Sequence, residues 1–289
     1  MENIEFYAYP TTKATSLEVT VEIDHHHPLQ ISPQDQQQLD KDWIERGYTR
    51  SSPIGTLSDV FFDKSTGKTK LIYQLTEYKI YSGIAFPALP DTERKLSSSL
   101  KESMKASANG CVVETADHKI IIQRRKEGLS TGGMLDSGAA GMMVYNNITQ
   151  QLNWQEQALE KLMRELHITP NTQQGPLTPQ AAFSSRGPVH IPAPKGYFTG
   201  CYSGMISCLA KVSYSYDDLL QIFDPQQVHE IIGVDKTDLA DFIVDHTTLP
   251  QNRGLNGDGC ASLLSTLPPD EFYHTIKRIN AKEKNKIRF

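Results

Sequence analysis

The sequence predicts a protein of the α/β class, because patterns typical of strands and of helices alternate along the chain. Short runs of Val and Ile between turns, such as residues 112–113 and 120–122, are typical of buried strands. Residues 154–166 repeat their apolar side chains at helical spacing and predict an amphipathic helix. The composition, with 38% hydrophobic and 22% charged residues, is that of an ordinary globular protein.

A small α+β region is expected first, and a boundary near residue 100. The segment 85–105 combines two prolines with a cluster of serines, which is typical of a linker. We therefore expect a region 1–100 and a second domain 101–289. The elements expected before the boundary are a strand over 17–23, a helix that begins at Ser32-Pro33 and runs to Arg46, and a hairpin of residues 59–63 and 71–81 with Gly67 in its turn.

The second domain is expected to begin with a strand pair and to continue through a Gly-rich segment into the amphipathic helix. A Pro/Gly/Gln-rich loop over 169–194 should follow, because Pro170 closes that helix. The expected elements are strands over 110–115, 119–125, 204–212 and 231–234, and helices over 154–166, 237–245 and 269–282. The stretch 254–259 is expected to be a turn.

The net charge and the absence of known motifs argue against several functional classes. A net charge of -5 argues against a general nucleic-acid binder, which needs a basic surface. The basic end, residues 274–289, is interpreted as a solvated helix end, with a weak RNA or membrane contact as the alternative. Walker A, HExxH and GxSxG motifs are absent from the sequence. The run Asp24-His25-His26-His27 is interpreted as a solvated loop rather than a metal site.

The chain is expected to be cytoplasmic. Its start lacks the pattern of a secretory signal, and no apolar run is long enough for a membrane span. The four cysteines include no CxxC pair, so we expect free thiols in a reducing compartment rather than a zinc site or disulfides.

Two strands, a Gln-Arg-Arg, a Gly-rich turn and an amphipathic helix together resemble the front half of a Nudix hydrolase domain. The resemblance implies an α/β/α sandwich with a mixed sheet. The family's motif has a Gly, a helix with Arg-Glu-x-x-Glu-Glu, and a closing Gly. Its Gly position matches Gly138 or Gly141, its last Glu matches Glu165, and His167 replaces the closing Gly.

The acidic face of that motif is degenerate in this chain. Lys161 and Arg164 stand where the family has two Glu, and Glu160 stands where it has Arg. Positions 161, 164 and 165 share one helix face, on which the family holds Mg²⁺ for pyrophosphate hydrolysis. The ordinary alternative is a pair of surface salt bridges, Glu160 with Arg164 and Lys161 with Glu165.

The layout outside the motif resembles UDP-sugar diphosphatases of the same superfamily. The similar segments are LSDVFFD and LIYQLTEYKIYSG before the core, and Val228-His229-Glu230 with the helix after it. The resemblance implies a nucleoside diphosphate-type substrate. It implies Glu165 and Glu230 as catalytic residues, Glu165 and Glu160 as ligands of Mg²⁺ or Mn²⁺, and Arg124, Arg125, Lys161 and Arg164 as substrate-binding residues. Glu230 is alternatively a rim residue of its strand.

Two functions follow from the resemblance. The first is a hydrolase of a nucleoside diphosphate linked to another moiety, such as a UDP-sugar, with a weakened metal site. The second is a catalytically inactive Nudix fold without a metal, which binds a phosphorylated nucleotide, a protein partner or a second copy of itself. A Lys and an Arg repel a metal ion but bind phosphate well, so phosphate binding is the stronger expectation.

Overall fold

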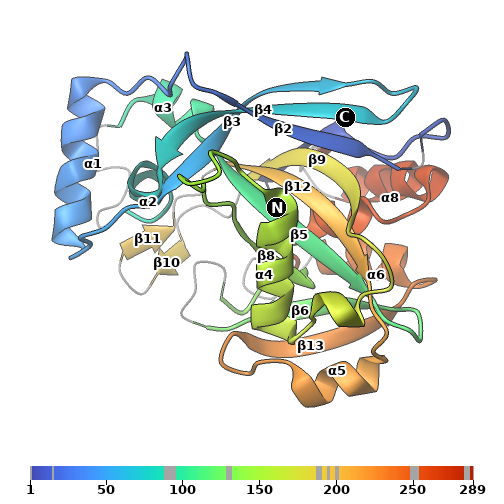
Figure 1. Ribbon diagram of the computed structural model, residues 1–289. Coiled ribbons are helices and arrows are strands. Elements are labelled where there is room, and N and C mark those ends of the chain that lie inside the picture. Colours follow the sequence, from blue (N-terminus) through green and yellow to red (C-terminus); the bar gives the residue numbers. More distant parts are fainter. Residues whose placement is uncertain are drawn as a thin grey trace.

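The computed structural model describes residues 2–14, 16–87, 96–127, 132–186, 191–193, 196–198, 202–247, 254–282 and 287–288. Among them, twelve strands form one mixed sheet, and helices lie on both of its faces (Figure 1). The helices are α1 (Pro33–Glu45), α2 (Tyr78–Ala85), α3 (Ser98–Ser103), α4 (Trp154–Leu166), α5 (Tyr216–Ile222), α6 (Leu239–Thr247), α7 (Gly257–Leu264), α8 (Pro269–Lys282) and the 3-10 turn η1 (Pro170–Thr172).

The strands of the sheet follow the order β14-β1-β9-β12-β5-β3-β4-β2, with β6, β7, β8 and β13 joined on at β5 and β6. The pairs β12–β5, β2–β4 and β1–β14 are parallel, and the other pairs are antiparallel. The bounds are β1 (Glu2–Ala8), β2 (Glu18–Asp24), β3 (Pro53–Phe62), β4 (Lys68–Glu77), β5 (Lys105–Glu114), β6 (Lys119–Arg125), β7 (Leu135–Ser137), β8 (Ala139–Met142), β9 (Thr178–Arg186), β12 (Tyr202–Lys211), β13 (Val228–Asp235) and β14 (Ile287–Arg288); β10 (Ile191–Ala193) and β11 (Gly196–Phe198) pair separately.

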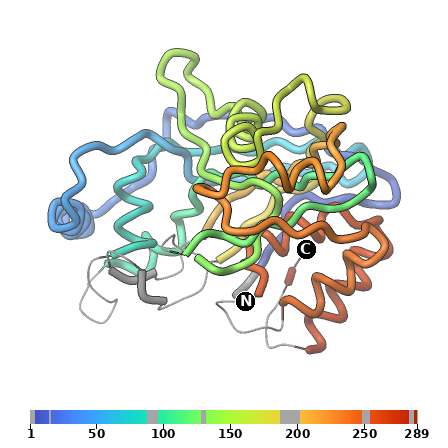
Figure 2. The backbone as a smooth tube through the Cα atoms, turned by 90° about the horizontal axis from the view of Figure 1, so that it is seen from below, coloured from blue at the N-terminus to red at the C-terminus, as the bar shows by residue number. Residues whose placement is uncertain are grey.

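Two apolar cores lie on opposite faces of this sheet. Ala158, Leu162 and Leu166 of α4 pack on one face, whereas α6, α7 and α8 pack on the other. Figure 2 shows α4 and the C-terminal helices on opposite sides of the central strands. The predicted α/β/α sandwich with a mixed sheet is therefore confirmed.

The first strand is second from one edge of this sheet and has a neighbour on each side. β1 pairs with β9 on one side, where Phe6 lies opposite Phe183, and with β14 on the other, where Ile4 lies opposite Ile287. The rings of Phe6 and Phe272 on α8 are 5.1 Å apart at their centroids. A hydrogen-bonded pairing of Thr56 on β3 with β5 also joins residues on either side of position 100. The domain boundary near residue 100 stays a prediction.

Three elements differ from the sequence-based expectations. The strand expected over 71–81 ends at Glu77, and α2 begins at the next residue because its apolar face packs against α1. The loop expected over 169–194 contains β9, which is buried in the middle of the sheet. The turn expected over 254–259 leads directly into α7, whose first turn is capped when Asn256 Oδ1 accepts a hydrogen bond from Gly259 N at 2.5 Å.

Other expectations are confirmed. Ser32 caps α1 by accepting a hydrogen bond from Asp35 N, and Gly67 adopts a positive φ of 76° in the β3–β4 turn. Cys111, Cys208 and Cys260 are buried, as expected, while Cys201 lies outside the described residues. No helix within the described ranges is long and apolar enough to span a membrane.

The basic C-terminal segment is in part a helix end. Arg278 and Lys282 of α8 form ion pairs with Asp241 and Asp245 of α6, at 2.7 and 3.6 Å. Lys284 and Lys286 lie outside the described residues.

Candidate functional site

Helix α4 is positioned by its two ends and by its apolar face. Asn153 Oδ1 accepts a hydrogen bond from Glu156 N at 3.2 Å and caps the first turn. Leu162 and Leu166 are fully buried, so the polar side of the helix is fixed relative to the sheet. His167 ends the helix in the left-handed conformation, with φ 54°. A glycine is usual at such a helix end, and the resemblance placed the family's closing Gly at this position.

Glu165 is held by two side chains at the edge of the buried region. Its Oε1 accepts a hydrogen bond from Arg164 Nη2 at 2.8 Å, and its Oε2 accepts one from Gln123 Nε2 on β6 at 3.4 Å. Glu165 is 7% exposed. Among the described residues, neither expected surface bridge forms: Arg164 pairs with its neighbour instead of Glu160, and Lys161 does not pair with Glu165.

Lys161 is the cation of this face without an ion-pair partner in the described part of the chain. Its side chain is half-buried and crosses Gly141 on β8, where an added Cβ would run into the lysine and would lie 3.1 Å from Nζ. The pKa of Lys161 is lowered, first by desolvation and then by the charge of Arg164. Gly141 therefore makes room for an ammonium group that no carboxylate of the described residues pairs with.

Arg125 extends the same face on β6. Its Nη1 donates to Asp136 Oδ2 on β7 at 2.9 Å, and Asp136 is 1% exposed. The charges of Asp136 and Glu165 both act on Arg125, and the charge of Arg125 acts on Lys161. We call Arg125, Asp136, Lys161, Arg164 and Glu165 the α4 charge cluster. It contains three cations and two carboxylates, so its formal charge is positive.

Arg124 and Glu230 form a separate pair. Arg124 Nε lies 2.9 Å from Glu230 Oε2 on β13, and Arg124 Nη1 donates to Gly133 O at 3.0 Å. Side chains alternate along a strand, so Arg124 points away from the face of Arg125. No described contact joins Glu230 to Glu165, and a catalytic role for either residue stays a prediction.

The acidic donors of the predicted metal site do not converge. Glu160 is exposed on α4, whereas Glu165 is buried and already accepts hydrogen bonds from Arg164 and Gln123. Within the described ranges, no group of three His, Cys, Asp or Glu residues is arranged to hold a metal ion. A divalent cation prefers several oxygen ligands, and here two cations adjoin the buried carboxylate. The residues present therefore fit Mg²⁺ poorly.

The histidine run near the N-terminus matches its interpretation as a loop. His27 Nδ1 lies 2.9 Å from Asp24 Oδ2, and this hydrogen bond is the main cause of a lowered pKa of Asp24. The pair closes a local turn.

Sequence patterns missed Asp136 and Gln123 as members of the site. Asp136 follows the apolar pair Met134-Leu135 inside the Gly-rich segment, and an acid directly after a buried strand residue was the available signal. Its partner, Arg125, is brought beside it by the pairing of β7 with β6, which the sequence does not show.

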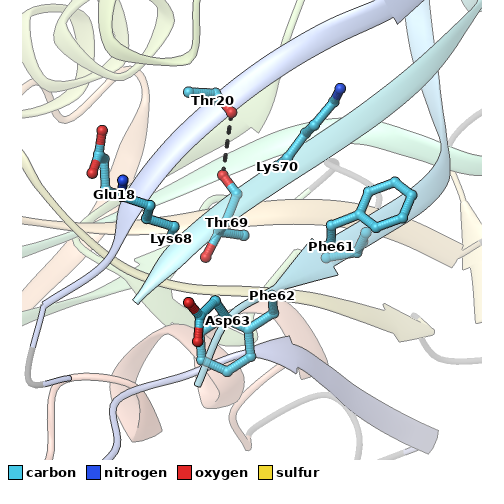
Figure 3. Close-up of a pocket in the computed structure, with 9 residues that line it drawn as sticks. Glu18, Thr20, Phe61, Phe62, Asp63, Lys68, Thr69 and Lys70 are labelled. Carbon is cyan, nitrogen blue, oxygen red and sulfur yellow. Dashed lines mark hydrogen bonds between the residues drawn. The ribbon is translucent and has the colours of Figure 1, made fainter. Parts of the chain in front are cut away.

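Two surface hollows lie away from the α4 charge cluster. One, of about 580 Å³, is an open groove over β2, β3 and β4, where Phe61 is exposed and Thr20 Oγ1 donates to Thr69 O at 3.4 Å (Figure 3). The other, of about 600 Å³, lies between His26, Asp35 and Ser97. Neither is lined by a residue of the cluster, so neither hollow contributes to the site described above.

Comparisons with known proteins leave the family open. No family model matches the sequence, and no curated protein matches it. Solved structures that resemble the fold include DR0079 from Deinococcus radiodurans (TM-score 0.36, 14% identity, 55% of this chain and 80% of that one). They also include the Nudix hydrolase RenU from M. smegmatis (TM-score 0.28, 12% identity, 47% of this chain and 74% of that one). A third is a MutT protein from Methanosarcina mazei (TM-score 0.27, 14% identity, 62% of this chain and 96% of that one). Overlaps this weak assign neither a family nor an activity.

Proposed function

We propose that this protein is a Nudix-type fold that binds the diphosphate of a nucleoside diphosphate-type ligand at the α4 charge cluster, without requiring a metal ion. The observation that carries the proposal is Lys161, a half-buried ammonium without an ion-pair partner among the described residues. A buried cation is costly unless it is paired, and a phosphate would supply the missing partner.

The neighbouring residues suit the same ligand. Arg164 and Arg125 are each held by a carboxylate at 2.8 and 2.9 Å, which orients their planar guanidinium groups. A guanidinium can donate two parallel hydrogen bonds to a phosphate, while a lysine acts as a point charge. In this proposal Glu165 positions Arg164 and does not act as a metal ligand.

The proposed substrate class and the proposed independence from metal are supported by different observations. The UDP-sugar class comes from the resemblance of the segments before and after the core, and the metal-free mode comes from the two cations beside Glu165. Metal-dependent hydrolysis would require Glu165 to release Arg164, so it is the competing function.

Titration calorimetry with UDP, a UDP-sugar and inorganic pyrophosphate tests the proposal. We expect binding of equal strength in excess EDTA and in excess Mg²⁺, with the UDP-sugar recovered intact by chromatography. Lys41→Met provides a control, because Lys41 is an exposed lysine on α1. Binding that needs Mg²⁺ and is lost in Glu165→Gln, together with release of UMP, would replace this proposal with the hydrolase. Absence of binding to all three compounds would reject both.

A further inference from the structure

Two serine hydroxyls share one carboxylate oxygen on the face of the sheet opposite α4. Ser203 Oγ on β12 donates to Asp258 Oδ1 on α7 at 2.6 Å, and Ser185 Oγ on β9 donates to the same oxygen. The two hydroxyl oxygens are 3.3 Å apart. This trio is not used by the α4 charge cluster.

Close packing of α7 places Asp258 at this point. A Cβ on Gly259 would lie 2.8 Å from the Cα of Asp136, and a Cβ on Gly257 would lie 3.3 Å from Ser185 Oγ. The two glycines therefore let the first turn of α7 approach β7 and β9. Asn256 caps this turn, which fixes the direction in which Asp258 points.

The two serines differ in access. Ser185 is 1% exposed, whereas Ser203 and Asp258 are both partly accessible from solvent. Ser203 is therefore the more accessible of the two serines. The buried serine then orients the carboxylate, and the accessible serine is available to react.

We propose that Ser203 is a nucleophile, activated by Asp258 as general base, for acyl transfer from an ester. The geometry meets the requirements for an activated serine: the hydroxyl lies within hydrogen-bond reach of a base, and a third group, Ser185, holds the base in place. Ser203 lies within a strand. The GxSxG motif marks a serine at a strand-to-helix turn, so the motif is not expected around Ser203.

The carboxylate of Asp258 is a stronger base than an ordinary aspartate. Desolvation by the surrounding protein raises its pKa to about 6, against the opposing effect of the two serine hydrogen bonds. Of the charged groups around it, Asp136 raises the pKa further and Arg125 lowers it. At neutral pH Asp258 is therefore mostly ionised, and its pKa lies closer to neutrality than that of an ordinary aspartate, as general-base catalysis favours.

Protons and bonds balance in two half-reactions. Asp258 takes the proton of Ser203 Oγ as the oxygen attacks the carbonyl carbon, and the tetrahedral intermediate then expels the alcohol, which receives that proton. Water next attacks the acyl-enzyme and gives a proton to Asp258. Collapse of the second intermediate breaks the bond to Ser203 Oγ, which takes the proton back, and the carboxylic acid leaves.

Nearby groups suggest which esters fit. Arg186 lies over the ring of Tyr202 at 5.6 Å, and these two residues adjoin the two serines in the chain. An ester with an aromatic ring, which could lie beside this pair, is therefore the first substrate to test.

A fluorophosphonate probe, which labels activated serines, tests the proposal on the full chain. We expect an adduct on Ser203 by peptide mass spectrometry, hydrolysis of p-nitrophenyl acetate, and loss of both in Ser203→Ala. Asp258→Asn should slow labelling about 10²–10⁴-fold, the usual contribution of a general base. The control Ser58→Ala, an exposed serine bonded to Ile72 O, should label as the wild type does.

The outcomes that overturn the proposal are distinct. They are a folded wild-type chain that is not labelled, labelling that persists in Ser203→Ala, and equal labelling rates in Asp258→Asn and wild type. If Asp258→Asn fails to fold by circular dichroism, the wild-type pH profile decides. The rate should rise as Asp258 loses its proton, and a flat profile between about pH 5 and about pH 8 would reject Asp258 as the base. No readout depends on phosphate binding, so this test is independent of the proposed function.

Discussion

Replacing Lys161 with Met should weaken diphosphate binding and leave the fold at least as stable. Lys161 has no ion-pair partner in the described residues. The variant therefore loses the binding free energy of one charge-assisted hydrogen bond to phosphate. Such a bond contributes about 1.5–3 kcal/mol, which corresponds to a roughly 10- to 150-fold increase in Kd. Arg164→Met should cost less, because Arg164 already donates to Glu165 at 2.8 Å and a ligand phosphate competes with that bond.

The stability of the same variant separates a binding role from a structural one. The lowered pKa of Lys161 means that the unfolded chain binds its proton more tightly than the folded chain. Its charge therefore opposes folding at neutral pH, and this effect fades as the pH rises through the folded pKa. Lys161→Met should unfold at an equal or higher urea concentration. Unchanged UDP affinity, or a lower urea midpoint, would refute the assignment of Lys161 as an unpaired ligand-binding cation.

Three further substitutions, with Met163→Ala as a control, test the packing by urea unfolding. His167→Gly should raise the free energy of unfolding by about 1 kcal/mol, because a left-handed backbone costs an L-residue about 1–2 kcal/mol and the glycine loses more entropy on folding. Leu162→Ala, at a fully buried position of α4, should lower it by about 2–5 kcal/mol, whereas Met163→Ala at an exposed position should change it little. Arg46→Met should lower it by about 3–5 kcal/mol, because it leaves the buried carboxylate of Asp42 without the guanidinium 2.9 Å away. Equal midpoints for the Leu162 and Met163 variants, or a neutral Arg46 variant, would contradict the packing described here.

Elements with local signals could be predicted from the sequence. The helix over 154–166 was predicted with the bounds that the structure shows, because its apolar spacing and its end near Pro170 are encoded within a few residues. The same holds for the start of α1 at Ser32-Pro33.

Elements that depend on distant packing were missed. Residues typical of strands, Tyr78, Ile80 and Tyr81, follow Glu77 directly, and only the contact with α1 shows that the chain turns into a helix there. The sequence of β9 contains Pro179 and small residues, and it becomes a strand because β1 and β12 lie on either side of it. Tertiary context decides such segments, and local propensity does not.

The candidate site was predicted only in part for the same reason. Helical spacing correctly placed Lys161, Arg164 and Glu165 on one face. It could not show that Arg164 would form an ion pair with its neighbour Glu165, or that Arg125 of β6 would form one with Asp136. The Arg125–Asp136 pair comes from the pairing of β6 with β7, which no spacing within α4 encodes.

The position of β1 has a consequence for synthesis of the chain. Both neighbours of this strand, β9 and β14, are synthesised well after it. Long-range pairing of this kind slows folding, and an unpaired strand edge can join other chains in the meantime. We therefore expect β1 to complete its pairing only after translation has passed residue 288, and chaperone access during synthesis to affect the yield of folded protein.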